Sequence, residues 1–172
     1  MKVLMLAPPG AGKGTQGERI AAEFGVEHIS SGSLLRAAVA ADTPLGREVA
    51  AHLAAGTLAP DALVTQAVKP VLDERDGFVL DGFPRTLAQT EAVDFDMVIY
   101  LEVPDDVLMA RMLARGRADD NEDVIAERLR EYARDTEPLI DHYRQAGVLV
   151  EVDGHRPADE VTADLVQLLK NA

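Results

Sequence analysis

A glycine-rich loop near the N-terminus constrains this chain more than any other segment. The apolar run Val3–Leu6 leads into Ala7-Pro8-Pro9-Gly10-Ala11-Gly12-Lys13-Gly14-Thr15, and a stretch with helical spacing follows. Glycines let backbone N–H groups turn inward around a phosphate, the N-terminus of the next helix is partly positive, and lysine adds a mobile cation. The order of strand, loop and helix therefore predicts a site for nucleotide phosphates.

The loop departs at two positions from the strict phosphate-loop pattern, which is GxxxxGK followed by Ser or Thr. Ala7 occupies the first glycine position, and Gly14 stands directly after Lys13. The structural alternative is a glycine-rich turn between a strand and a helix, with an exposed lysine. The clustering of glycine around Lys13 favours nucleotide binding over that alternative.

Short apolar runs recur along the chain, separated by longer stretches with helical periodicity. Several runs are continuously hydrophobic, which is typical of strands covered by helices on both faces. The alternation predicts an α/β fold, a doubly wound five-stranded parallel sheet with helices on both faces. With the phosphate loop after its first strand, this sheet would be of the P-loop NTPase type. The runs are Val3–Leu6, His28–Ile29, Phe78–Leu80, Met97–Leu101 and Val148–Val152.

Side-chain spacing also predicts the helices and one interruption. A series with the three- and four-residue steps of one helix face consists of Ile125, Leu129, Tyr132, Thr136, Leu139 and Tyr143. Because Pro138 lies inside that series, we expect a kink or break near Glu137. The Ala-rich stretch from Ala37 to Ala55 is predicted to be helical and not a linker.

The length predicts one domain over residues 1–172, since about 100–200 residues is the usual size of a domain. Two intervals look like additions to the sheet. The first, about residues 31–59, fits a small helical substrate-binding segment that ends in a turn before Pro60. The second, about residues 115–121, is a short polar joint between two helices, where a lid would lie.

The charge balance limits the partners of the chain. It has 17 Lys plus Arg against 30 Asp plus Glu, a formal charge of −13, so we expect no nucleic acid or membrane partner. With no cysteine, disulfides, thiol catalysis and cysteine-containing zinc sites are excluded. No apolar run approaches the ~20 residues of a membrane span, and the N-terminus does not resemble a signal peptide, so a cytoplasmic location is expected.

These motifs resemble those of the adenylate kinases, within the nucleoside monophosphate kinase family. Pro8–Gln16 is similar to that family's phosphate loop, in which Gly-Thr follows the lysine. The resemblance continues in the family's order through Ile29–Arg36, Asp81–Thr86 with Gln89, Arg115–Asp120 and Arg128–Tyr132. It covers essentially the whole chain, and the combination is more specific than any one motif. The joint near Arg115 resembles the family's shortest lid, without zinc cysteines.

The resemblance implies a reversible, Mg²⁺-dependent phosphoryl transfer between ATP and AMP that yields two ADP, without zinc. Arginine suits this chemistry because its fork makes bidentate hydrogen bonds to phosphate and stays charged at any working pH. Positioning and electrostatics carry most of such a reaction, so no general base is needed, and the four histidines receive no role. The implied catalytic residues are Lys13, Arg85, Arg115, Arg117 and Arg128.

The resemblance also assigns the binding residues. Those implied for ATP are Gly10, Ala11, Gly12, Lys13, Gly14, Thr15, Arg111, Arg115 and Arg156. Those implied for AMP are Ser31, Arg36, Thr57, Leu58, Ala59, Gly82, Phe83, Pro84, Arg85, Gln89, Arg117 and Arg128. Asp81 is the implied metal residue, orienting waters around Mg²⁺. Asp119 and Asp120 are expected to pair with the lid arginines or, just before a helix, to act as N-cap residues.

The choice of monophosphate rests on fewer residues. Ser31 keeps the hydroxyl of the threonine usual in adenylate kinases, and the Gln89 amide suits a purine edge, so AMP is preferred. One alternative is a kinase of the UMP/CMP type. Another is a nucleotide-binding module with weak or no catalysis, motivated by Ala7 and by Ser33, which replaces the family's aspartate. The expected partners are ATP, AMP and ADP, bound by a monomer.

Overall fold

The computed structural model describes all residues, 1–172, and its centre is a five-stranded sheet. The strand order is β2-β3-β1-β4-β5, and every neighbouring pair is parallel. The strands are β1 (Lys2–Leu6), β2 (Glu27–Ser30), β3 (Phe78–Asp81), β4 (Met97–Glu102) and β5 (Leu149–Asp153). The predicted parallel α/β sheet is therefore confirmed, with each strand where the apolar runs indicated.

Successive side chains of each strand enter different hydrophobic clusters. On β1, Leu4 and Leu6 join one cluster, whereas Val3 and Met5 join the other. Since side chains alternate across a strand, these two clusters lie on the two faces of the sheet. A strand buried on both faces has no polar side, which explains the continuous apolar runs in the sequence.

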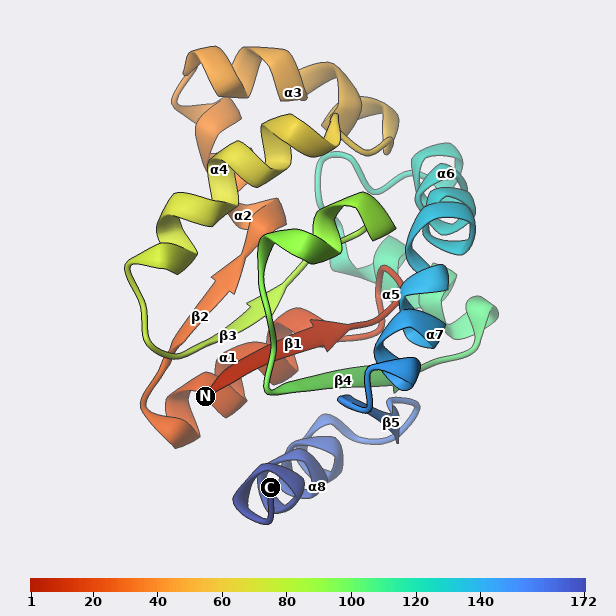
Figure 1. Ribbon diagram of the computed structural model, residues 1–172. Coiled ribbons are helices and arrows are strands. Elements are labelled where there is room, and N and C mark those ends of the chain that lie inside the picture. Colours follow the sequence, from red (N-terminus) through yellow and green to blue (C-terminus); the bar gives the residue numbers. More distant parts are fainter.

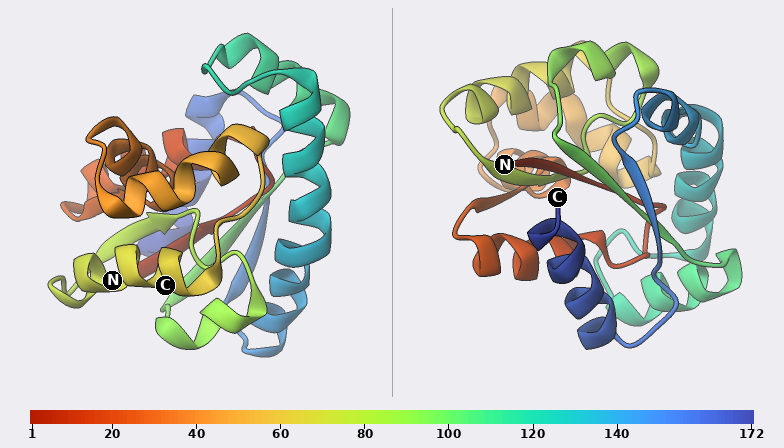
Figure 2. Two further views of the ribbon diagram at one scale, coloured as in Figure 1. Left: turned by 90° about the horizontal axis from the view of Figure 1, so that it is seen from above. Right: turned by 60° about the horizontal axis from the view of Figure 1, so that its bottom comes forward.

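Helices cover both faces of the sheet (Figure 2). On the face with Val3 and Met5 lie α1 (Lys13–Phe24), α5 (Asp105–Arg115) and α8 (Ala158–Lys170). On the other face lie α4 (Asp61–Asp73), the 3₁₀ helix η1 (Leu87–Ala92) and α7 (Pro138–Gln145). Figure 1 shows the two chain ends on the same side of the molecule.

The interval 31–59 holds two helices that stand beyond the carboxyl end of β2 (Figure 1). They are α2 (Ser31–Ala40) and α3 (Pro44–Ala55). The expectation of helix from Ala37 to Ala55 is correct except at residues 41–43, where the chain turns. Thr43 caps α3 by accepting a hydrogen bond from the Gly46 N–H, and Pro44 occupies the first turn, where its missing N–H costs nothing.

The long helical series after residue 121 breaks close to the predicted position. It consists of α6 (Glu122–Glu131), the π-helical segment η2 (Tyr132–Thr136) and then α7. Pro138 lacks the N–H that a continuous helix would donate to the Arg134 carbonyl, and the Glu137 N–H bonds to the Tyr132 carbonyl five residues back instead, at 2.8 Å.

Candidate active site

A cleft opens at the carboxyl ends of the strands, where ligands bind in doubly wound folds. It gathers side chains from five separate parts of the chain: the phosphate loop, α2, the 56–59 turn, the loop after β3, and the helices around the 116–121 joint. Its charged lining residues are Lys13, Arg36, Asp61, Arg85, Arg115, Arg117, Asp119, Arg128 and Glu131. Six cations thus face one cleft in a protein whose overall charge is −13, as a polyanion site requires.

The phosphate loop lies between β1 and α1, in the predicted order of strand, loop and helix. Gly12 precedes α1 with a φ of 94°, in the left-handed region that favours glycine, and the N-terminus of α1 begins at Lys13. Burial, together with the neighbouring Arg85 guanidinium, lowers the pKa of the Lys13 ammonium to about 8, although the Asp81 carboxylate opposes this effect. Lys13 is therefore held without a full counter-charge, a state that an anionic ligand would relieve.

Binding of ATP should be accompanied by proton uptake above about pH 8. In the free protein Lys13 loses its proton as the pH rises through about 8, whereas a bound polyphosphate favours the charged ammonium. The affinity for ATP should therefore weaken above that pH. Calorimetric titration in buffers of different ionisation enthalpy measures the uptake. In Lys13→Arg, whose side chain stays charged, the uptake should vanish, and equal uptake by both proteins would contradict the assignment.

Asp81 ends β3, and a histidine that the sequence did not single out contacts it. His28 Nε2 lies 2.5 Å from Asp81 Oδ2, and both side chains are largely buried. Burial alone would raise the pKa of Asp81, but the hydrogen bond with His28 and the charge of Lys13 hold it below its ordinary value. Asp81 is thus an anion fixed in orientation beside Lys13. Only the alignment of β2 with β3 brings the two residues together, and no local pattern signals it.

Arg85 lies in the loop after β3, and two hydrogen bonds to nearby residues hold it there. Arg85 Nε donates to the Gly82 carbonyl at 2.8 Å, and the Arg85 backbone N–H donates to Gln89 Oε1 at 2.8 Å. Gly82 has a φ of 80°, and any side chain there would collide with the Ser31 hydroxyl. Burial lowers the pKa of the Arg85 guanidinium, partly offset by the Asp81 charge. Nη1 and Nη2 of Arg85 make no hydrogen bond within the protein, so both are available to an anion.

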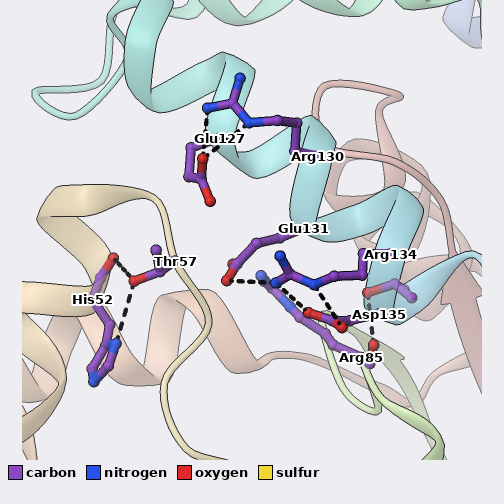
Figure 3. A network of polar contacts seen from close by, with 9 residues as sticks. His52, Thr57, Arg85, Glu127, Arg130, Glu131, Arg134 and Asp135 are labelled. Atoms are coloured by element: carbon purple, nitrogen blue, oxygen red, sulfur yellow. Dashed lines mark hydrogen bonds and ion pairs between the residues drawn. The ribbon is translucent and has the colours of Figure 1, made fainter.

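The side of the cleft formed by α2 and the 56–59 turn brings together the residues that the resemblance assigned to AMP. Ser31, Thr57, Leu58, Ala59, Gly82, Pro84 and Gln89 all line it, as does Arg36. Thr57 Oγ1 lies 3.3 Å from His52 Nδ1, which ties the turn to α3 (Figure 3). The Phe83 side chain is fully buried in the core, so the part that Phe83 could take in binding falls to its backbone.

Glu131 is a second cleft residue that the sequence reading missed. Its side chain is buried at the end of α6 and lies near Arg85 and Arg134 (Figure 3). Burial raises the pKa of the Glu131 carboxyl, and the Leu58 backbone N–H and Arg134 oppose that shift. The carboxylate is therefore one of the few negative groups among the cleft arginines, and it borders the 56–59 turn.

The 116–121 joint is organised by two carboxylates. Asp120 Oδ2 and Oδ1 accept hydrogen bonds from Arg115 Nε and Nη2, at 2.8 and 2.7 Å, and Oδ1 also accepts from Arg128 Nη1 at 2.7 Å. Asp119 pairs with Arg128 as well. The expected pairing with the arginines is thus confirmed, whereas the N-cap of α6 is Asn121, whose side chain accepts from the Val124 N–H at 3.0 Å.

Arg111 and Arg156 lie outside the main cleft. Arg111 donates to the Ala11 carbonyl and to the Gly154 carbonyl, each at 3.3 Å, so it links the phosphate loop to the loop after β5. That position fits the ATP side of the site. Arg156 Nη2 lies 2.7 Å from Asp164 Oδ2, and its guanidinium also faces Asp153. The Arg156 guanidinium is therefore paired with a carboxylate of α8. The contact of Arg156 with ATP stays a prediction.

The two departures from the family pattern have simple structural accounts. Ala7 is buried and has no positive φ, so the backbone there does not demand glycine. Ser33 is exposed, and its Oγ accepts a hydrogen bond from Arg36 Nη2 at 3.3 Å. Neither residue removes a cation from the cleft.

The carboxylates do not form a cage for a metal. No group of three or more His, Asp or Glu side chains gathers to hold one. A lone carboxylate beside a phosphate site nevertheless fits Mg²⁺, which keeps several waters and takes other ligands from substrate phosphates. Asp81 has that position. None of the helices is long and apolar enough to cross a membrane.

Comparisons with known proteins agree on one family. A family model described as adenylate kinase matches residues 5–148. A relative named adenylate kinase from Nocardia farcinica is 45% identical over 181 residues, covering 98% of this chain and 99% of the relative. Another so named, from a Synechococcus species, is 46% identical over 185 residues, covering 98% and 96%. A third, from Methylobacterium radiotolerans, is 44% identical over 192 residues, covering 99% and 96%.

Proposed function

The chain belongs to the adenylate kinase family, and we propose that it uses this cleft to transfer the terminal phosphoryl group of ATP reversibly to AMP, giving two ADP. One observation carries the proposal: six cations from distant parts of the chain line one cleft at the carboxyl edge of the sheet. Two polyanions must approach each other in this reaction, and a dense set of fixed cations lowers the cost of that approach.

The phosphate loop is the proposed ATP side. The backbone N–H groups of Gly10, Gly12 and Gly14 suit a phosphate cradle, and Lys13 would bridge the phosphates. Arg111 fits the adenine side through its place between Ala11 and Gly154. Mg²⁺ bound with ATP would add positive charge at the phosphate oxygens, and Asp81 would orient its waters.

The opposite wall is the proposed AMP side. Arg36 and Arg85 would hold the monophosphate, and their guanidinium forks match its oxygens. The Gln89 Oε1 accepts the Arg85 N–H, so the Gln89 amide nitrogen is the group that would donate to a base. The relatives named adenylate kinase support AMP as the monophosphate.

The lid is the proposed closing element. Arg115, Arg117 and Arg128 would close over the transferred group from residues 115–121 and α6, and residues 31–59 would close from the other wall as the monophosphate-binding segment. Closure of both excludes water, which prevents ATP hydrolysis and strengthens the electrostatic contacts. No residue needs to act as a general base, because alignment and charge supply the catalysis.

Two alternatives were weighed against this function. A UMP/CMP-type kinase gains no support from the family model or from the relatives described above. A binding module without efficient transfer has no need for cations on both walls. Retention of Arg36 and Arg85 opposite Lys13 therefore favours the enzyme.

The proposal is tested by Mg²⁺-dependent ADP formation from ATP with AMP, CMP, UMP and GMP in turn. We expect AMP to be preferred by about 10²-fold or more in kcat/KM, because a site that hydrogen-bonds one base leaves buried groups unpaired with another. Lys13→Ala and Arg85→Ala serve as inactive controls. Tight nucleotide binding without turnover would favour the binding module, and equal turnover of CMP or UMP would favour the pyrimidine kinase.

We further infer that one domain, working as a monomer in the cytoplasm, carries the whole reaction. One chain carries the cations of both the proposed ATP side and the proposed AMP side, which supports this inference. Gel filtration at assay concentrations tests this inference, with a single peak near the 18.5 kDa mass of one chain as the expected result.

A further inference from the structure

Thr136 contacts the cleft loop from a distant part of the chain. Its Oγ1 donates a hydrogen bond of 2.7 Å to the Arg85 backbone carbonyl, across 51 residues of sequence. Thr136 is only 5% exposed and lines the cleft, so this bond is sheltered from water. A sheltered hydrogen bond is stronger than an exposed one, because the dielectric around it is lower.

Thr136 is the last residue of the π-helical segment η2. In an ordinary helix a threonine hydroxyl often bonds to the carbonyl four residues earlier, which for Thr136 is that of Tyr132. Thr136 ends the π-helical segment, where the Glu137 N–H bonds to the Tyr132 carbonyl at 2.8 Å and Pro138 offers no N–H at the next position. The Thr136 hydroxyl bonds across to Arg85 and not to its own helix. Single-turn π segments often lie at functional sites, where they redirect one side chain.

The bond completes a set of anchors around Arg85. The Gln89 side chain holds the Arg85 N–H and the Gly82 carbonyl holds Nε, but these partners lie in the loop itself and in η1, which directly follows it. Thr136 is the anchor that joins the loop to the helical run beginning with α6, which also carries Arg128. Arg85 and Arg128 line one cleft, and Thr136 ties their two elements together.

We propose that Thr136 is a positioning residue for Arg85, holding the 82–85 loop at the distance from α6 that lets the Arg85 guanidinium meet the phosphate of the monophosphate substrate. This proposal rests on the proposed function. In this role the hydroxyl acts through the Arg85 carbonyl, to which it donates its proton, and not through a contact with either nucleotide. Its effect passes through the backbone of Arg85 to the two free nitrogens of the guanidinium.

The test compares Thr136→Val, which keeps the shape and loses the hydroxyl, with Thr136→Ser, which keeps the hydroxyl. Thr136→Val should lower kcat/KM for AMP about tenfold and leave the KM for ATP within about twofold, because a small misplacement of a positioned group has large kinetic effects. Thr136→Ser should stay within about threefold of the parent. The matched control is Thr90→Val, which removes another threonine hydroxyl bonded to a carbonyl at 2.7 Å, that of Leu87.

A double-mutant cycle separates positioning from simple loss of stability. In an Arg85→Ala background there is no guanidinium left to position, so adding Thr136→Val should change the affinity for AMP, measured by calorimetry, by less than about twofold. A full tenfold loss in that background would overturn the proposal, as would equal losses in the KM values for ATP and AMP. If Thr136→Val does not fold, Thr136→Ala takes its place in the same cycle.

The role of Thr136 can be tested even if the proposed function fails. Were the parent protein to bind AMP without turning it over, AMP affinity measured by calorimetry would replace kcat/KM in the same comparison. Weaker AMP binding in Thr136→Val but not in Thr136→Ser would then still support positioning of Arg85. Unchanged AMP binding in both variants would overturn it.

Discussion

Replacing Arg85 with lysine should lower kcat for ADP formation about 10³-fold while the protein stays folded. A single well-placed donor to developing charge is worth about 10²–10³-fold, and an arginine over a transferring phosphoryl group as much or more. Lysine keeps the positive charge but loses the fork and the Nε bond to the Gly82 carbonyl. Charge alone therefore cannot replace Arg85, because its value lies in the fixed direction of its two remaining nitrogens.

The measurement is steady-state turnover with ATP and AMP, accompanied by circular dichroism and thermal unfolding. Arg144→Lys is the matched control: Arg144 is exposed on α7 and pairs with Asp141 and Glu151, far from the cleft lining. Its activity should match the parent within about twofold. A loss smaller than tenfold in Arg85→Lys would mean that Arg85 supplies charge without geometry, contrary to its anchored position.

The strands could be predicted because both of their faces are buried among apolar side chains. A strand such as β1 that is buried on both faces needs only apolar residues, so a short continuous run reveals it without knowledge of its neighbours. The order of strands is a different matter. β2 and β3 pair although they are far apart in the sequence, and this pairing depends on the whole sheet. The contact between His28 and Asp81 follows from the pairing, so the histidine could not be assigned from its local sequence.

The break after α6 likewise has one feature that the local sequence predicts and one that depends on distant residues. Pro138 predicted an interruption near Glu137, because proline removes an N–H wherever it lies in a helix. The form of the break, a π-helical segment whose Thr136 hydroxyl donates to the Arg85 carbonyl 51 residues away, has no signal in the local sequence. Glu131 likewise reads as an ordinary helix surface residue until the 56–59 turn covers it.

The motifs predicted which arginines line the site. They did not predict which carboxylates pair with those arginines. A motif indicates which arginines come to the cleft, and Arg36, Arg115, Arg117 and Arg128 do line it. The motif does not indicate which carboxylates compete for them. Arg156 is engaged by Asp164 of α8, a contact that only the packing of the last helix creates. Ligand contacts of such residues depend on how readily the internal ion pairs open.

The ion pairs of Asp120 lead to the second prediction: Asp120→Asn should destabilise the protein by about 2 kcal/mol at neutral pH. The Asp120 side chain is fully buried and holds both Arg115 and Arg128. Removing one partner of a buried pair costs about 3–5 kcal/mol, but both arginines retain some exposure to water, which reduces the loss. Asparagine keeps one acceptor oxygen and turns an amide N–H₂ group toward two guanidinium groups, which have no acceptor for it.

The pH dependence gives this prediction its specific signature. Burial alone would raise the pKa of Asp120, but the hydrogen bonds from Arg115 and Arg128 lower it to about 2, below the ordinary 3.8. A carboxyl whose pKa is depressed on folding stabilises the protein above its unfolded pKa and loses that effect as the pH falls toward the folded value. The stability difference between parent and Asp120→Asn should therefore be constant above about pH 5 and shrink between pH 4 and pH 2.

Urea unfolding across that pH range measures the difference, with Asp141→Asn as the control. Asp141 also pairs with an arginine, Arg144, but its side chain is 77% exposed, so its loss should cost less than about 0.5 kcal/mol at any pH. Asp120→Asn should in addition lower kcat about tenfold, since Arg115 and Arg128 lose the carboxylate that holds them side by side. A stability loss that persists unchanged at pH 2 would assign the effect to packing, and the lid arginines would then be organised by Asp119 alone.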